Sequence, residues 1–331
     1  MIGADTKDVE RKVLTILRVL SETQQPLGAR LIAQRLKEYG VELGERAVRY
    51  HLKLMDERGL TNLIGRDGRV ITERGIEEVC DAMVGDKVGF AITRIELLAF
   101  RTDFDWDKGT GSVPVNVSFF PRRKFSRALD TMKSIFAAGL CVSDRIAVAH
   151  EGQQLGDLIV PEGQTGLATV CSIVINGTLL KAGVPMDSRF GGTLQIRNRK
   201  PIRFVELLNY SGSSLDPSEV FIRARMTSVR SAAEDGNGKI LANFREIPAA
   251  CRPIVERVTK RLKQIGINGL FVMGNTSESV CEISVELNKI GMVLIGGLNP
   301  VAAAEELGIE AQNYGMSTVM EYEKLTRVWE I

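Results

Sequence analysis

Histidine is scarce in this sequence, and cysteine occurs without the spacing that metal sites need. The 331 residues include only His51 and His150, together with five cysteines of which none forms a CxxC pair. Zinc sites combine four cysteine and histidine ligands at short, regular spacings, so we predict no metal site. The cysteines are odd in number and scattered, which predicts free, mostly buried thiols in a reducing compartment.

Long apolar runs are missing as well. The uncharged stretches 290–304 and 166–180 fall short of the roughly 20 apolar residues that a membrane helix needs. Asp5 and Asp8 stand where a secretion signal would need a basic start and an apolar core. We therefore expect a cytoplasmic protein with no membrane partner.

Catalytic motifs are absent too. The sequence contains no GxxxxGK[ST] phosphate loop, no HExxH, no GxSxG and no cluster of carboxylates. With little histidine for acid–base chemistry, we predict a protein that is not an enzyme and has no catalytic residues and no cofactor. An enzyme acting on a small acid stays open as a rival, and a search for turnover of bound metabolites would decide it.

What is present is an ordinary globular composition. Hydrophobic residues make up 44% of the chain and charged residues 25%, with a net charge of +2. The length suffices for two or three domains of roughly 100–200 residues each.

The first eighty residues have the pattern of a winged helix-turn-helix. Apolar side chains recur at helical spacing over 8–21, 29–39 and 45–58, and Gly40 ends the second helix. A hairpin with its turn at Asp67-Gly68 follows, and 73–83 is expected to form a closing helix. We predict a DNA-binding domain over 1–83.

The third helix carries the candidate DNA contacts. Arg46, Arg49, Tyr50 and Lys53 fall on one face, opposite Ala47, Val48, His51, Leu52 and Met55. Arg pairs with guanine and Lys or Tyr reaches phosphates. Arg66 and Arg69 flank the hairpin tip and complete the predicted set. A solvated or protein-binding face is the alternative, because 1–83 balances 14 basic against 14 acidic residues.

The rest of the chain reads as an internal duplication. A glycine, an alternating strand and a proline that opens a helix occur at 111–121 and again at 238–248. Further echoes pair 179–183 with 287–291, and 190–193 with 314–317. We predict a regulatory domain of two halves, 84–214 and 215–331, of α+β or α/β class, with a ligand in the cleft between them.

Glycine- and serine-rich segments of this domain are candidates for that ligand site. Backbone amides and hydroxyls near a cation suit a carboxylate, which points to Lys181, Arg189, Gly191, Gly192, Ser213 and Ser214. Ordinary turn chemistry explains the same glycines and serines.

Several of these segments resemble the NrpR repressors of archaea. The resemblance rests on the winged helix and on 88–92, 116–118, 180–185, 188–192, 209–217 and 226–229. It implies a transcriptional repressor of nitrogen-assimilation genes, with 2-oxoglutarate as the effector that releases it from DNA. We expect a homodimer on double-stranded operator DNA, with a second family member or basal transcription factors as further partners. A co-repressor or adaptor that binds transcription proteins instead of DNA is the alternative.

Overall fold

Residues 2–23, 25–81 and 88–331 are described by the computed structural model, and they fall into two units, Met1–Lys87 and Val88–Ile331. The boundary predicted between 83 and 84 lies outside the described residues. No helix within the described ranges is both long and apolar enough to cross a bilayer.

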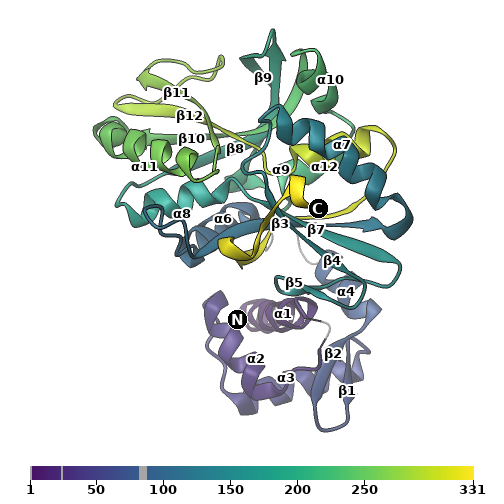
Figure 1. Cartoon of the computed structure of the whole chain (residues 1–331). Helices are drawn as coiled ribbons and strands as arrows, with labels where there is room; N and C mark the ends of the chain where they lie inside the picture. Colours follow the sequence, from purple (N-terminus) through teal and green to yellow (C-terminus); the bar gives the residue numbers. More distant parts are fainter. Residues whose placement is uncertain (1, 24, 82–87) are drawn as a thin grey trace. The chain divides into compact units, whose positions relative to one another are not determined.

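The first unit is a winged helix, as predicted (Figure 1). Its elements are α1 (Ile2–Ser21), α2 (Ala29–Leu36), the 3-10 turn Lys37–Tyr39, α3 (Glu45–Glu57), β1 (Thr61–Ile64), β2 (Gly68–Ile71) and α4 (Glu73–Asp81). Gly40 has φ +69° after the second helix, a conformation that glycine adopts without steric cost. Ile16, Leu36 and Leu52 are fully buried where the three helices meet.

The second unit contains two five-stranded sheets. In the first, the order is β13 (Gln312–Glu321), β3 (Ser112–Pro121), β7 (Gln164–Val170), β4 (Arg145–His150) and β14 (Thr326–Arg327). In the second, it is β11 (Leu270–Thr276), β12 (Lys289–Ile295), β10 (Gly238–Pro248), β8 (Asp187–Arg197) and β9 (Lys200–Asn209). A short hairpin, β5 (Gln154–Leu155) with β6 (Leu158–Ile159), stands apart. Every pairing among these described strands is antiparallel, so the α+β reading holds for the domain.

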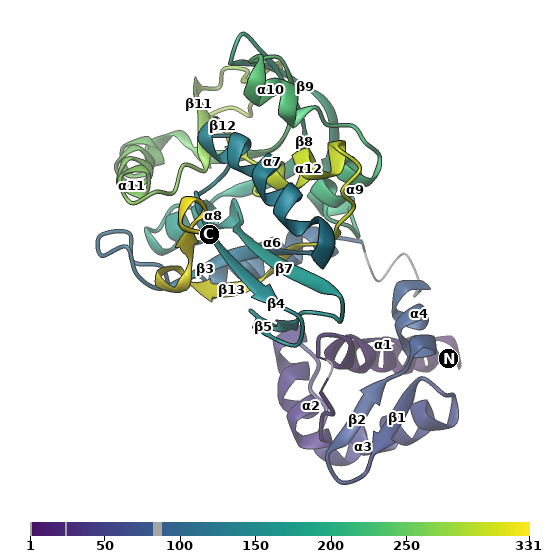
Figure 2. The same cartoon turned by 45° about the vertical axis from the view of Figure 1, so that its right-hand side comes forward.

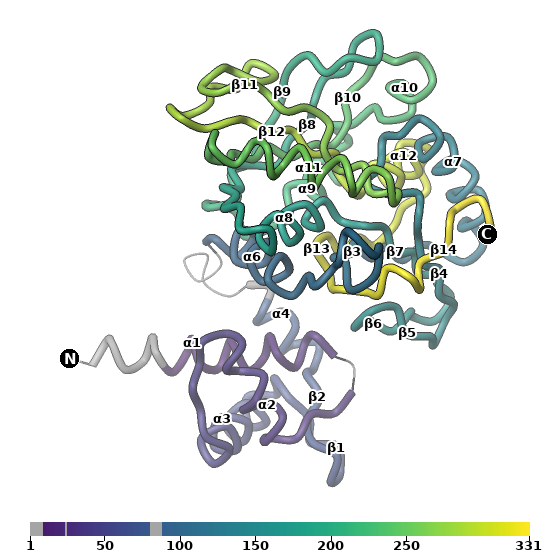
Figure 3. The backbone as a smooth tube through the Cα atoms, turned by 60° about the vertical axis from the view of Figure 1, so that its left-hand side comes forward, coloured from purple at the N-terminus to yellow at the C-terminus, as the bar shows by residue number. Residues whose placement is uncertain are grey.

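The two halves exchange strands. β13 from the end of the chain pairs with β3, as Figure 3 shows, and β8 from the first half pairs with β10 of the second. The orders β4-β7-β3-β13 and β11-β12-β10-β8 therefore correspond. Matching bonds bear this out: the amide of Cys171 donates to Pro114 at 2.8 Å, and that of Gly296 donates to Leu241 at 2.9 Å. The predicted halves 84–214 and 215–331 each supply strands to both sheets.

The helices pair across the halves in the same way. They are α6 (Phe90–Arg101), α7 (Phe125–Ala137), α8 (Ile173–Lys181), α9 (Pro217–Arg223), α10 (Val229–Glu234), α11 (Arg252–Gln264) and α12 (Asn299–Glu306). α7 of the first half packs on α12 of the second (Figure 2), and α11 of the second packs on α8 of the first. Each pair covers a core with strands of both sheets, one holding Met132 and Phe244 and the other Val117 and Val258.

The repeat predicted from sequence is only partly matched by these elements. Residues 190–193 and 314–317 lie at corresponding places on β8 and β13. The proposed match of 179–183 with 287–291 is wrong, because the first segment ends α8 and the second leads into β12. Similarity over a short segment of sequence does not distinguish the end of a helix from the start of a strand.

Candidate functional site

Helix α3 has two chemically different faces. One face is buried in the core of the first unit and consists of Val48, His51, Leu52 and Met55. The opposite face, which we call the recognition face, is exposed and consists of Arg46, Arg49, Tyr50 and Lys53. Tyr50 is 63% exposed. Side chains three and four residues apart on a helix lie side by side, so this face is one continuous surface.

The neighbours of this face leave its charge available. Arg49 forms an ion pair with Glu45 one turn away, but its side chain is 68% exposed, and such pairs are weak in water. His51 behind it is buried, and its Nδ1 atom has no hydrogen-bond partner among the described residues. Burial, reinforced by the charge of Lys12, lowers the pKa of His51. The imidazole therefore belongs to the core.

The two wing arginines differ in role. Arg66 is exposed at the hairpin tip. Arg69 donates from Nε to the Asp56 carboxylate at 2.8 Å and its side chain is only 19% exposed. The Arg69 backbone also pairs with Leu27 through bonds of 2.9 and 3.0 Å. Arg69 thus holds the wing against α3 and lies apart from the exposed cations with which it was predicted.

The six residues predicted for ligand binding do not come together. Lys181 donates to the Phe100 carbonyl at 3.1 Å, at the end of α6. Gly191 and Gly192 are interior positions of β8, where an added Cβ would meet Pro217 at 2.9 Å and the Glu206 backbone at 2.4 Å. Close packing against the start of α9 explains Gly191, and close packing against β9 explains Gly192.

The two serines belong to the loop that leads into α9. Ser213 Oγ donates to the Leu215 carbonyl at 2.6 Å and accepts from the Leu215 amide at 3.2 Å. Ser214 follows in the same loop and is half-buried. The Ser213 hydroxyl shapes this turn, as the alternative reading of the sequence expected.

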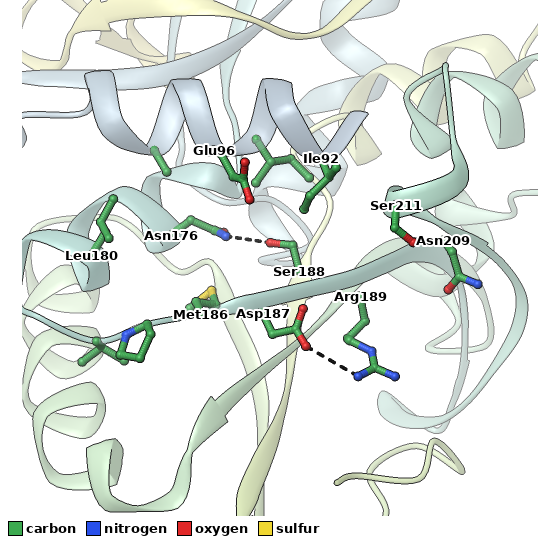
Figure 4. A pocket seen from close by; sticks show the side chains of 14 residues that line it. Ile92, Glu96, Asn176, Leu180, Met186, Asp187, Ser188, Arg189, Asn209 and Ser211 are labelled. Atoms are coloured by element: carbon green, nitrogen blue, oxygen red, sulfur yellow. Dashed lines mark hydrogen bonds and ion pairs between the residues drawn. The ribbon is translucent and has the colours of Figure 1, made fainter. Parts of the chain in front are cut away.

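Arg189 is the predicted ligand residue that lies at a pocket. This pocket, of about 650 Å³, lies beside α6, α8 and the start of β8 (Figure 4). Arg189 Nη1 is held by Glu286 at 2.7 Å, Glu246 at 3.2 Å and Asp187 at 3.5 Å. These contacts raise the pKa of Arg189, and the hydrogen bond to Glu286 makes the largest contribution.

The polar groups of this pocket do not suit a dicarboxylate. Figure 4 shows Asn176 bonded to Ser188, a contact of 3.0 Å, with Glu96 nearby. Glu96 and Asp187 bring two negative charges to the lining, while the single guanidinium is already shared among three carboxylates. A dianion would meet net repulsion there.

A second, smaller pocket lies where the two halves meet. Its lining includes Cys171, Ser172 and Ile173 at the start of α8, and Gly297 and Leu298 just before α12. The first turns of two corresponding helices therefore meet at one hollow of about 20 Å³, which is room for about one water molecule. Helix N-termini carry partial positive charge and unpaired amides, so they favour anions. We call this hollow the central pocket.

Arg245 adds a full positive charge to the central pocket. It is 1% exposed, and its Nε has no hydrogen-bond partner among the described residues. Its Nη1 donates to the Phe244 carbonyl at 3.1 Å, and its guanidinium carbon lies 4.7 Å from the centre of the Tyr210 ring. A buried cation is costly unless it is compensated, and the Asp216 carboxylate in the same lining supplies part of that compensation.

Amides, hydroxyls and carboxylates complete this pocket. Tyr210 donates its hydroxyl to Asn243, whose Nδ2 donates to Ser172 Oγ at 3.1 Å. Asp216 accepts from the Ser218 amide at 2.9 Å, at the start of α9. Nearby, Glu219 accepts from the Gly315 amide at 2.6 Å.

Both carboxyl groups hold protons more tightly than usual. Burial raises the pKa of Glu219 to about 7, and the negative charge of Asp216 adds a smaller contribution in the same direction. Burial also raises the pKa of Asp216. Glu219 therefore exchanges a proton near neutral pH.

Sequence reasoning missed this pocket. Arg245 and Glu246 are adjacent charges inside an otherwise apolar strand pattern, and that conflict is the signal that could have marked a buried polar site. The convergence of two helix starts has no signal in the sequence, because it depends on the exchange of strands.

The thiols and the possible metal ligands can be placed as well. Cys141 and Cys171 are buried and free, and burial raises the pKa of each to about 12. Cys251 and Cys281 are free and half-buried, while the side chain of Cys80 lies outside the described part. Within the described residues, no three His, Cys, Asp or Glu side chains are grouped to hold a metal ion.

Comparisons with known proteins match both units. A family model described as NrpR regulatory domains 1 and 2 matches residues 88–327, and one described as the ribonuclease R winged-helix domain matches 14–79. The chain is similar to a solved structure of a nitrogen repressor-like protein from Methanococcus jannaschii, with a TM-score of 0.62 and 28% identity. That match covers 72% of this chain and 98% of the other.

Curated relatives match most of the chain. A protein named global nitrogen regulator NrpRI, from Methanosarcina mazei, is 40% identical over 97% of this chain and 98% of its own length. Proteins named global nitrogen regulator NrpR, from Methanococcus maripaludis and Methanocaldococcus jannaschii, are 33% and 32% identical over 89% and 97% of this chain. The chain spans only 51% and 56% of the lengths of these two.

Proposed function

Since the chain belongs to the NrpR family of nitrogen regulators, we propose that it is a transcriptional repressor of nitrogen-assimilation genes. It binds operator DNA as a homodimer in the cytoplasm and is released by 2-oxoglutarate. The observation that carries DNA binding is the recognition face of α3, where Arg46, Arg49, Tyr50 and Lys53 are exposed on a helix whose back is buried.

The proposed DNA contacts follow from this geometry. A recognition helix lies in the major groove while the wing meets the neighbouring backbone, and a dimer reads two half-sites about 34 Å apart. Arg46 and Arg49 are placed to pair with bases and Lys53 and Tyr50 to reach phosphates, with Arg66 at the wing tip. Arg69 holds the wing in place.

The central pocket is the proposed effector site. Two helix starts and the buried Arg245 offer positive charge to the carboxylates of 2-oxoglutarate. The hollow of about 20 Å³ is too small for a five-carbon dicarboxylate, so binding requires the starts of α8 and α12 to move apart there. A ligand shifts an equilibrium only when it prefers one arrangement, and here the effector prefers the opened one.

The test is DNA binding by the whole purified chain. Duplexes retained from a random-sequence pool are measured by fluorescence anisotropy with 2-oxoglutarate, and with glutarate, which lacks the keto group, as the control. We expect sequence-selective binding that weakens at least tenfold with 2-oxoglutarate and little with glutarate. Failure to retain any duplex at low salt contradicts DNA binding, and selective binding that ignores 2-oxoglutarate contradicts only the effector.

A co-repressor that binds transcription proteins is the second candidate. The balanced charge of 1–83 favours it, with a second family member or basal transcription factors as its partners. Direct DNA binding predicts that affinity falls steeply with salt, because phosphate contacts release counterions. A co-repressor predicts no such dependence.

A further inference from the structure

The two halves of the regulatory unit build the same turn from different residues. Pro121 ends β3 with φ −54° and ψ 125°, and Pro248 ends β10 with φ −59° and ψ 136°. A three-residue 3-10 turn and a thirteen-residue helix follow in both halves. The backbone amide of the residue after each proline is also bonded in the same way. The Arg122 amide donates to the Gly163 carbonyl at 3.0 Å, and the Ala249 amide donates to the Asn288 carbonyl at 2.9 Å. The backbone of this turn is therefore the same in both halves.

The side chains on the two turns differ sharply in charge. The first turn consists of Arg122, Arg123 and Lys124, and the second of Ala249, Ala250 and Cys251. Three residues further on, Arg127 corresponds to Ile254. The second half thus forms this structure with no cation in the turn. The positive charges of the first half are not required by the fold.

The three cations of the first turn and Arg127 in the first turn of α7 are exposed and uncompensated. Arg122, Arg123, Lys124 and Arg127 all lie at the surface, and no carboxylate of the described residues comes within 4.0 Å of their nitrogens. Glu151, from the neighbouring loop, accepts from the Gly163 amide at 2.9 Å. We call these four side chains the basic turn.

We propose that the basic turn binds the sugar–phosphate backbone of DNA, so that the regulatory unit contributes to DNA affinity independently of sequence. Partners that are proteins usually bury aromatic or apolar side chains at the centre of the contact, and the basic turn offers none. Closely spaced, exposed Lys and Arg side chains suit a phosphate chain, and the one aromatic residue among them, Phe125, is half-buried against the core. This inference rests on the DNA binding proposed above.

The experiment grafts the second turn onto the first. The variant Arg122→Ala, Arg123→Ala, Lys124→Cys carries residues that the same fold already accepts, and Arg122→Gln, Arg123→Gln, Lys124→Gln is a second version that keeps a polar but uncharged side chain at each position. The control removes three exposed cations of α11, by Arg257→Ala, Lys260→Ala and Lys263→Ala. The slope of log affinity against log salt concentration is measured for the whole chain on duplex DNA.

Both turn variants are expected to reduce the slope by about 2–3, since each lost phosphate contact removes about 0.9, while the control leaves it within about 0.5 of the original chain. Preference among duplex sequences stays unchanged, because phosphates carry no sequence code. If the slope is unchanged in both turn variants, the inference is overturned. This holds even if the variants lose binding to an acidic protein, because the basic turn would then be a protein contact. If the original chain binds no DNA, the proposed function fails first.

Discussion

Asp56 on the recognition helix and Arg69 in the wing are joined by a hydrogen bond of 2.8 Å between carboxylate and Nε. Asp56 also accepts from the Thr61 hydroxyl at the start of β1. One carboxylate thus positions the wing relative to the helix, which sets where the exposed Arg66 stands relative to the recognition face.

Removing this carboxylate should loosen the wing. Asp56→Ala leaves the Arg69 guanidinium, 19% exposed, without its partner, and hydrogen bonds to charged groups contribute roughly 1.5–3 kcal/mol. We expect hydrogen exchange at the β1 and β2 amides to accelerate at least tenfold. Arg49→Ala, which breaks only the exposed pair with Glu45, should leave exchange there nearly unchanged. Equal protection in both variants contradicts the role of Asp56.

Substitutions on the recognition face should reduce DNA affinity in two different ways. Arg46→Ala should cost roughly 1–3 kcal/mol of operator affinity and relax sequence preference at one position, as expected for a base contact. Lys53→Ala should weaken binding to all duplexes alike and reduce the salt slope by about 1. Binding curves on matched and scrambled duplexes separate the two. Full affinity in both variants removes these residues from the interface.

Arg245 should control the effector response. Arg245→Met keeps much of the side-chain volume but removes the guanidinium, so 2-oxoglutarate should no longer weaken DNA binding, while DNA affinity without effector stays the same. Arg245→Lys keeps the charge but loses the fork of donors, and we expect a partial response. Circular dichroism checks that both variants are folded. If 2-oxoglutarate still weakens DNA binding by Arg245→Met to the full extent, the effector does not bind at Arg245.

The Glu219 carboxyl predicts a pH dependence. Its pKa is about 7 in the folded protein against an ordinary value of 4.5, so between these values the folded chain holds a proton that the unfolded chain has lost. Its contribution to stability is then fully present below pH 4.5 and is lost as the pH rises through 7. Urea unfolding can be followed by tryptophan fluorescence, because Trp106 and Trp329 both lie in the second unit.

Glu219→Gln should flatten this dependence between pH 5 and 8. The same carboxyl couples to the effector, because a dianion nearby favours its protonated form, so 2-oxoglutarate should bind more tightly at pH 6 than at pH 8. An identical pH profile for Glu219→Gln and the original chain contradicts both statements.

Gly297 should tolerate no side chain. A Cβ there would come within 2.5 Å of both Asn116 Nδ2 and the Val170 carbonyl, and overpacking costs typically about 1–3 kcal/mol. Gly297→Ala should therefore lower the urea midpoint of the second unit. Gly212→Ala is the matched control, because nothing lies within 4 Å of its added Cβ. Equal midpoints in the two variants contradict the close approach at Gly297.

The local chemistry of the first unit could be predicted from its sequence. Helical spacing placed Val48, Leu52 and Met55 inside and Arg46 and Lys53 outside, and the structure agrees. Arg69 escaped this reasoning because its position next to the turn predicts a tip residue, whereas its partner Asp56 is thirteen residues away. The central pocket could not be predicted for the same reason, because its lining comes from residues as far apart in the sequence as Asn116 and Met316.

The sequence by itself determined the elements of the winged helix and the repeated strand–proline–helix unit of the second unit, because periodicity, turn residues and proline act through neighbours along the chain. Only the tertiary structure decided that β8 and β13 change places between halves, and that Arg245 faces the starts of α8 and α12. A strand has the same alternation whichever sheet accepts it, and a buried charge shows its partner only once distant segments are packed together.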